Sequence, residues 1–242
     1  MGVVGDALSF LTTAESWSGS TGIPTRLWEH VFLSALGCVF AIAIALPVGM
    51  YIGHTGRFRF IAVSIGNLGR ALPSFGILGF VFPFTLQYEF PGDIGFSATL
   101  IAMVVLGIPP ILLNSYVGIE SVDRDVVEAS RGVGLTERQI LFRSELPLGM
   151  ALILAGIRNA AVAVVATATL GAIFGWGGLG RLIVDGFAQG DHGQLLAGAF
   201  LVALLAIATE LSLGLLERRF RRREGAVEAE EVLRTPPAIV AA

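Results

Sequence analysis

Long apolar segments that alternate with short polar ones are the feature that most restricts the fold of this sequence. An α-helix rises about 1.5 Å per residue, so about 20 apolar residues cross the hydrocarbon core of a membrane. Hydrophobic residues make up 54% of the chain, a share typical of polytopic membrane proteins rather than of soluble domains. The sequence therefore predicts an all-α polytopic membrane protein with about five transmembrane helices, at residues 27–52, 60–86, 98–116, 148–174 and 194–216.

Polar segments at both ends of the chain complete its domain organisation. Residues 1–25 form a lead-in rich in Ser, Thr and Gly, in which we expect a short interfacial helix at 7–11. Residues 26–217 form the transmembrane domain. Residues 218–242 begin with an arginine cluster and continue with acidic residues and prolines, so we expect a tail without ordered structure.

A charged segment, residues 119–147, separates the third span from the fourth in an otherwise charge-poor chain. It carries both signs of charge, and Gly132 and Gly134 interrupt its helix-forming residues. A polar helix-turn-helix held between two spans must lie in water, so we expect it to contact another protein. The alternative is a solvated loop that has no partner.

The arginines are distributed unevenly between the segments that connect the spans. One side holds Arg57, Arg59, Arg124, Arg131, Arg138, Arg143, Arg218, Arg219, Arg221, Arg222 and Arg223, whereas the other holds Arg181, with Arg26 at a boundary. Cytoplasmic loops carry an excess of basic residues. The first link, the charged segment and the tail are therefore predicted to be cytoplasmic, with the N-terminus outside a prokaryotic cell membrane.

All sixteen basic residues are arginines. Without a lysine the chain cannot form a GxxxxGK[ST] phosphate loop, a Schiff base or a Ser-Lys dyad. His30, His54 and His192 are scattered and show no metal-ligand spacing. We therefore expect no catalytic residue, metal site or cofactor in this chain. The arginine cluster of the tail adjoins a span, which predicts contact with anionic membrane lipids rather than with nucleic acid.

Polar and helix-breaking residues interrupt the second span between Asn67 and Ser74. Irregular backbone at membrane depth is tolerated only where protein or water covers it, so this segment is a candidate pathway or gate. The alternative is a simple kink at Pro73 with a snorkelling Arg70. We also expect the Pro109-Pro110 pair to break or bend the third span. The full set of candidate pathway or gate residues is Asn67, Arg70, Pro73, Ser74, Asn114, Arg158, Asn159 and Thr167.

Three ionisable residues, Arg70, Arg158 and Glu210, fall inside apolar runs. Such a charge costs at least ~2.5–3.5 kcal/mol at a helix centre, so it usually finds a partner. All three lie at a similar depth when counted from the cytoplasmic ends of their spans. Our hypothesis is an intramembrane ion pair of Glu210 with Arg158 or Arg70. The alternative is three separate snorkelling side chains.

The charged segment also resembles the EAA loop of ABC-importer permeases, which reads E-A-A, three residues, G, nine residues, I, one residue, L-P. Five of the seven fixed positions match, and the departures are Ser130 in place of Ala and Ser144 in place of Ile. The resemblance implies a fold like that of the methionine-importer permease and a coupling helix that inserts into a groove of an ATP-hydrolysing subunit. The ATPase-coupling residues that it implies are Glu128, Ala129, Ser130, Gly132, Gly134, Leu146 and Pro147.

A wider resemblance covers residues 21–216. The stretches GIPTRLWEHVFLS, ALPSFGIL, SYVGIESVDRDVVEASRGVG, LILAGIRNAAV and ATLGAIFGWGGLG look like the permeases of glycine betaine/carnitine/choline importers. This resemblance implies a permease subunit that moves a quaternary-amine osmoprotectant (glycine betaine, carnitine, choline or proline betaine) into the cell. It also implies two ATP-binding ABC subunits that hold ATP and Mg²⁺, a second permease chain, identical or paralogous, and an extracytoplasmic solute-binding protein.

Other functions remain open at this point. An ABC importer of amino acids such as methionine shares the EAA loop and the GGLG stretch. An ion-coupled secondary transporter or channel would predict inverted repeats and further intramembrane acids, which are not evident. A structural membrane scaffold would leave the EAA-like spacing as a coincidence.

Overall fold

The computed structural model describes residues 2–234, with side chains for residues 2–69 and 71–220. Its elements, all helical in this part of the chain, are α1 (Val3–Thr12), η1 (Ala14–Trp17), α2 (Ile23–Thr55), α3 (Arg59–Ala71), α4 (Ser74–Gln87), α5 (Phe96–Glu120), α6 (Arg124–Gly132), α7 (Glu137–Ile140), η2 (Leu141–Glu145), α8 (Leu146–Ala168), η3 (Thr169–Phe174), α9 (Gly180–Gln189) and α10 (His192–Arg234). Here η1 and η3 are 3₁₀ turns and η2 is a π-helical turn.

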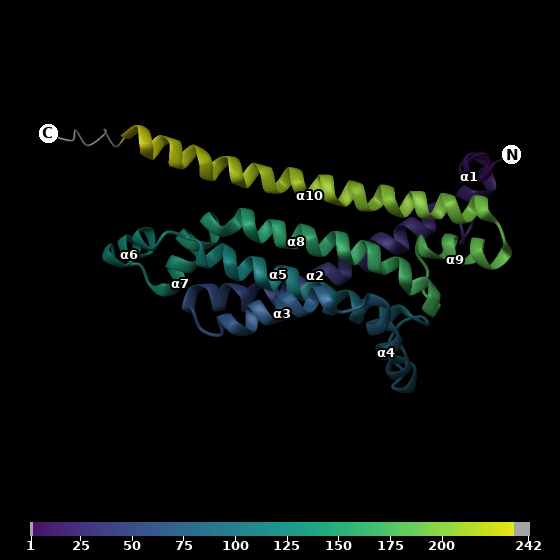
Figure 1. Cartoon of the computed structure of the whole chain (residues 1–242), viewed down its shortest axis with the longest axis horizontal. Coiled ribbons are helices and arrows are strands. Elements are labelled where there is room, and N and C mark those ends of the chain that lie inside the picture. Colours follow the sequence, from purple (N-terminus) through teal and green to yellow (C-terminus); the bar gives the residue numbers. More distant parts are fainter. Residues whose placement is uncertain (1, 235–242) are drawn as a thin grey trace.

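The centre of the bundle is α5, which packs along both α2 and α8 (Figure 1). Glycines let these backbones approach closely. A Cβ atom on Gly49 of α2 would lie 2.7 Å from the Leu112 carbonyl oxygen of α5, and one on Gly149 of α8 would lie 2.5 Å from the Gly118 oxygen of α5. Small residues at such contacts are typical of membrane helices, whose association depends on close packing.

The predicted second span is divided into two helices. α3 and α4 meet at an angle of 96° around Leu72 and Pro73, where Leu72 has the extended backbone that a following proline favours. Figure 1 shows α4 turned away from the bundle. Four helices in the described part are long and apolar enough to cross a membrane, or five if this bent pair counts as one span. The predicted all-α fold with about five spans is confirmed.

The third predicted span does not break at Pro109 and Pro110, because α5 continues through both residues. Of the two predicted effects, a break or a bend, the break is wrong for two local reasons. The fixed φ of proline is compatible with a helix, and neighbouring groups of the protein cover the two residues. Asn114 Nδ2 donates a hydrogen bond to the Pro110 oxygen at 2.8 Å, and α3 packs so closely on Pro109 that a Cβ on Gly69 would lie 2.3 Å from its ring.

The polar elements lie at opposite ends of the bundle: α6 and α7 at one end, α1 and α9 at the other (Figure 1). α10 packs against α1, α8 and α9. It continues to Arg234, whereas we expected the span to end near residue 216 and an irregular tail to follow. The rest of the expected tail, residues 235–242, lies outside the described residues. At the other terminus, α1 is longer than the expected helix at 7–11.

Candidate functional site

The charged segment folds into a helix-turn-helix whose turns are built by capping residues. Asp123 caps α6, since its side chain accepts a hydrogen bond from the Asp125 N–H at 2.9 Å. Thr136 and Gln139 form a capping box at the start of α7. Between the two helices Gly134 has a φ of +87°, a conformation that glycine adopts without strain.

An ion pair joins the two short helices. Arg131 Nε and Nη2 of α6 donate to the two carboxylate oxygens of Glu137 at the start of α7, at 2.8 and 3.0 Å. These hydrogen bonds raise the pKa of the Arg131 guanidinium above its ordinary value. A bidentate arginine–carboxylate pair fixes orientation as well as distance, so α6 is held in one direction relative to α7.

Glu137 also connects the charged segment to the end of α2. His54 Nε2 lies 3.3 Å from Glu137 Oε2, and His54 Nδ1 lies 2.5 Å from Glu145 Oε2 in η2. Glu145 is buried, with 5% of its surface exposed. One imidazole therefore bridges the last turn of α2 to two parts of the segment. Sequence reasoning missed this contact, because His54 and Glu145 are 91 positions apart.

The implied coupling residues do not share one surface. Glu128, Ala129 and Gly132 are exposed on α6. Leu146 starts α8 and packs against the core around Met50, Ile119 and Ile153, and Pro147 follows it at the helix N-terminus. Gly134 forms the turn.

The two serines that depart from the family pattern contact each other. Ser130 Oγ lies 3.1 Å from Ser144 Oγ, and it also donates to the Val126 oxygen at 2.8 Å. Where the pattern has an alanine and an isoleucine, this chain has a polar contact between α6 and η2.

A hollow of about 460 Å³ lies between α3, α4, α5 and α8, and we call it the bundle hollow. Its lining includes Ser74, Asn114, Asn159 and Thr167, four of the predicted pathway residues. Thr167 Oγ1 donates to the Ala163 oxygen at 2.8 Å, so its hydroxyl is bonded within its own helix. The lining residues carry no charge: Gly66, Gly69, Leu72, Ser74, Leu106, Pro109, Pro110, Leu113, Asn114, Asn159, Ala163, Ala166 and Thr167.

The remaining predicted pathway residues lie elsewhere. Asn67 and Pro73 are exposed and do not line the bundle hollow. The side chain of Arg70 is outside the described part of the chain. Arg158 turns toward α10, where its Nη1 lies 2.7 Å from Glu210 Oε1.

Arg158 contacts a second acid that sequence reasoning did not include. Its Nη2 lies 3.2 Å from Glu217 Oε2. Glu210, Gly214 and Glu217 are spaced by four and three residues, so they share one face of α10. The guanidinium packs over Gly214, since a Cβ there would lie 3.7 Å from Nη1. The spacing of Glu210 and Glu217 could have suggested this contact from the sequence. We did not include Glu217 because it lies at the expected boundary between the transmembrane domain and the tail.

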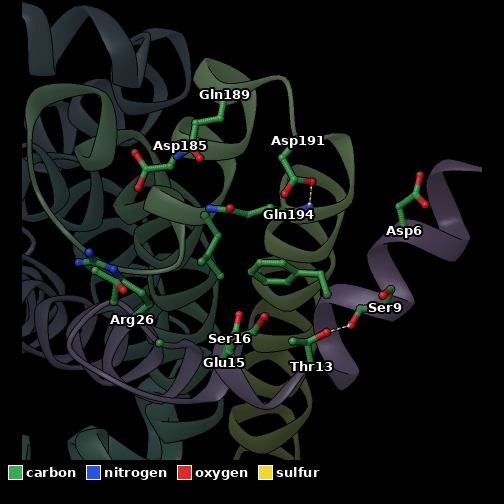
Figure 2. A pocket seen from close by; sticks show the side chains of 14 residues that line it. Asp6, Ser9, Thr13, Glu15, Ser16, Arg26, Asp185, Gln189, Asp191 and Gln194 are labelled. Atoms are coloured by element: carbon green, nitrogen blue, oxygen red, sulfur yellow. Dashed lines mark hydrogen bonds between the residues drawn. The ribbon is translucent and has the colours of Figure 1, made fainter.

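At the α1 and α9 end lies a polar hollow of about 580 Å³, lined by α1, η1, the start of α2, α9 and the start of α10. Figure 2 shows four acids among its lining residues, Asp6, Glu15, Asp185 and Asp191. The one cation of the lining is Arg26, which is paired with Glu29 at 2.9 Å. The polar hollow is therefore acidic.

Comparison with known proteins connects these features to a family. The sequence profile described as "Binding-protein-dependent transport system inner membrane component" matches residues 21–222. A carnitine transport permease protein, OpuCB, of Listeria monocytogenes is 34% identical over 194 residues, which cover 80% of this chain and 86% of that protein. The glycine betaine/carnitine/choline transport system permease protein OpuCB of Bacillus subtilis is 30% identical over 79% of this chain and 85% of its own.

Solved structures agree with the fold. The inward-facing MetNI methionine ABC transporter aligns with a TM-score of 0.68 at 22% identity, over 82% of this chain and 95% of that one. An amino acid ABC transporter aligns with a TM-score of 0.65 at 18% identity, over 89% and 97% of the two chains. At these identities the likeness concerns the fold alone. The profile match and the relatives together show that this chain belongs to the family of inner membrane components of binding-protein-dependent transport systems, as the resemblance predicted.

Proposed function

We propose that this chain is the permease subunit of an ATP-driven importer of quaternary-amine osmoprotectants. The observation that carries the proposal is the similarity, over about four fifths of the chain, to permeases named for carnitine, choline and glycine betaine. The cargo is a small cation or zwitterion with a methylated ammonium group. An extracytoplasmic binding protein would capture it, commonly through cation–π contacts in an aromatic cage.

The charged segment would receive the force of ATP hydrolysis. α6 presents Glu128, Ala129 and Gly132 to solvent, the Arg131–Glu137 pair connects it to α7, and the His54–Glu145 contact connects the following η2 to α2. A rigid exposed helix can transmit a push from a partner, whereas a loose loop cannot. The proposed partners are two ATP-binding subunits, on which ATP and Mg²⁺ bind.

The arginine distribution supports an orientation in which α6 and α7 are cytoplasmic and α1 and α9 are extracytoplasmic. In that orientation the acidic polar hollow faces the outside, beside residues 175–193. We infer that the binding protein docks on this end, on residues 87–97 and 175–193.

The bundle hollow supports a pathway that is only half built by this chain. It is open to its surroundings and lined on one side by α3 and α4. A second permease chain, identical or paralogous, would complete its wall. The neutral amide and hydroxyl groups of the lining can solvate a passing ammonium ion without holding it tightly.

Reconstitution tests the substrate class. The permease, its ATPase and its binding protein are assembled in proteoliposomes, and uptake of labelled glycine betaine, carnitine, choline and methionine is measured with ATP enclosed. We expect uptake of at least one quaternary amine and none of methionine. Uptake of methionine alone would support the amino-acid importer instead, and uptake without ATP would contradict the importer class.

A further inference from the structure

Glu29 is an acid in the second turn of an apolar helix, and its carboxylate is shared between two donors. Its Oε2 accepts a hydrogen bond from Arg26 Nη1 at 2.9 Å, within α2. The same oxygen accepts the backbone N–H of Gly178 at 2.7 Å, from a residue 149 positions away. The Glu29 side chain is 27% exposed and that of Arg26 15%, so the group is largely enclosed.

The backbone that receives this carboxylate is shaped around it. We call residues 175–179, which join η3 to α9, the glycine turn. A Cβ on Gly177 would lie 2.1 Å from Glu29 Oε2, so any side chain there would displace the carboxylate. Gly178, which donates the hydrogen bond, has a φ of +76°. The close approach and the donor therefore both depend on glycine.

The glycine turn is continuous with an aromatic contact to α4. Phe174, the last residue of η3, places its ring 5.6 Å from the ring of Phe75 and 5.1 Å from that of Phe82, measured between centroids. Such distances are typical of favourable aromatic pairs. Phe75 follows Ser74, which lines the bundle hollow. Glu29 is thus linked to the wall of the hollow through one hydrogen bond, the backbone of residues 174–178 and the aromatic contact of Phe174 with Phe75.

We propose that Glu29 is a positioning residue of the transport pathway. By fixing the glycine turn, it holds Phe174 against the first turn of α4 and keeps Ser74, which follows the α3–α4 break, in its place in the wall of the bundle hollow. The inference rests on the proposed transport function and orientation. α4 packs mainly against α5 and, over a smaller area, against η3, so loss of the η3 contact leaves α4 supported by α5 alone among these two elements.

The accessibility of a thiol introduced at position 74 measures the positioning role of Glu29 directly. Cys38 is the single cysteine of this chain, so Cys38→Ala gives a background in which Ser74→Cys is the only thiol of the permease, and labelling is read on this chain. The assembled transporter is labelled with a membrane-impermeant cationic methanethiosulfonate in right-side-out and in inverted vesicles. Adding Glu29→Ala should raise the labelling rate from the outer face about tenfold, the usual effect of losing one charge-assisted hydrogen bond.

Two control variants distinguish a positioning role of Glu29 from a general disruption of the fold. Glu29→Gln keeps an oxygen that accepts the Gly178 N–H, so it should restore the labelling rate to within about twofold of the parent. Thr25→Ala, one turn earlier in α2, removes a hydrogen bond to the Gly19 oxygen and should leave the rate unchanged. Retained co-purification of the ATPase shows that each variant is folded and assembled.

A double variant tests the route through the aromatic contact. Phe174→Ala should raise labelling as Glu29→Ala does, and the pair together should give no further rise, because both changes break one chain of contacts. Unchanged labelling in Glu29→Ala from both faces, or fully additive rises in the double variant, would overturn the proposal. A rise seen only from the cytoplasmic face would refute the orientation and leave the contact chain intact, and transport of a different solute would not affect the result.

Discussion

Arg158 faces two carboxylates with one positive charge, and this imbalance predicts an asymmetric response to neutralisation. Arg158→Met leaves Glu210 and Glu217 with no cation in contact among the described side chains. Glu210→Gln or Glu217→Gln leaves a one-to-one ion pair in place. We therefore expect the arginine variant to destabilise the fold far more than either glutamine variant.

The burial of the three side chains determines the expected size of this destabilisation. Breaking a buried ion pair from one side costs about 3–5 kcal/mol. The Arg158 side chain is 26% exposed, that of Glu217 11% and that of Glu210 45%, so screening places the expected cost at the lower end, about 3 kcal/mol. Each single glutamine variant should cost less than about 1 kcal/mol, the usual size for a partly exposed pair.

The assay is equilibrium unfolding of the purified chain by SDS in mixed micelles, followed by far-UV circular dichroism. Arg181→Met provides a matched control. Its guanidinium pairs with one carboxylate, that of Asp185 in the short helix α9, so its loss leaves one acid unpaired where Arg158→Met leaves two, and it should cost less than about 1 kcal/mol. If Arg158→Met cost no more than Arg181→Met, or if Glu210→Gln alone matched Arg158→Met, the charge-balance reasoning would be wrong.

Three further predictions concern the charged segment and the core. Glu128→Arg should reduce co-purification of the ATPase and solute transport at least about tenfold, because a reversed charge at a docking surface costs several kcal/mol. Pull-down from detergent extracts measures the co-purification, and uptake into proteoliposomes measures the transport. A double-mutant cycle of Ser130→Ala with Ser144→Ile should show a coupling of about 1 kcal/mol in stability, the net value of one hydrogen bond, and additive effects would contradict the contact. Gly49→Val should destabilise the chain by about 1–3 kcal/mol through overpacking against α5, measured in the same SDS titration.

The spans could be predicted because membrane crossing depends on a one-dimensional property, the length of an apolar run. The break in the second span was also readable, since Pro73 and its polar neighbours cannot continue a helix in lipid. The break that was one of the two effects expected of Pro109 and Pro110 does not occur, because the effect of a proline on a helix depends on the groups that cover it. In the fold, Gly69 of α3 packs on the Pro109 ring.

Long-range polar contacts were only partly predictable. The Arg158–Glu210 contact follows from the cost of isolated charges in a membrane, which leaves few possible partners. The contact of His54 with Glu145 could not be predicted, because no sequence pattern indicates that the end of α2 packs on η2 and buries Glu145 there. Similarly, the hydrogen bond from Gly178 to Glu29 involves a backbone donor, and sequence patterns do not mark which backbone donors bind side chains.

The contacts at the two ends of α2 connect the separate parts of this structure. His54, in its last turn, contacts the charged segment, and Glu29, in its second turn, contacts the glycine turn. These residues are 25 positions apart in one uninterrupted helix, which corresponds to about 38 Å at 1.5 Å per residue. Since a packed helix moves as a unit more readily than it bends, a displacement of the charged segment would reach the glycine turn through α2 without passing through the α3–α4 break. On the proposed function, the histidine and the glutamate would act in transport through their places on a common helix, although neither lines the bundle hollow.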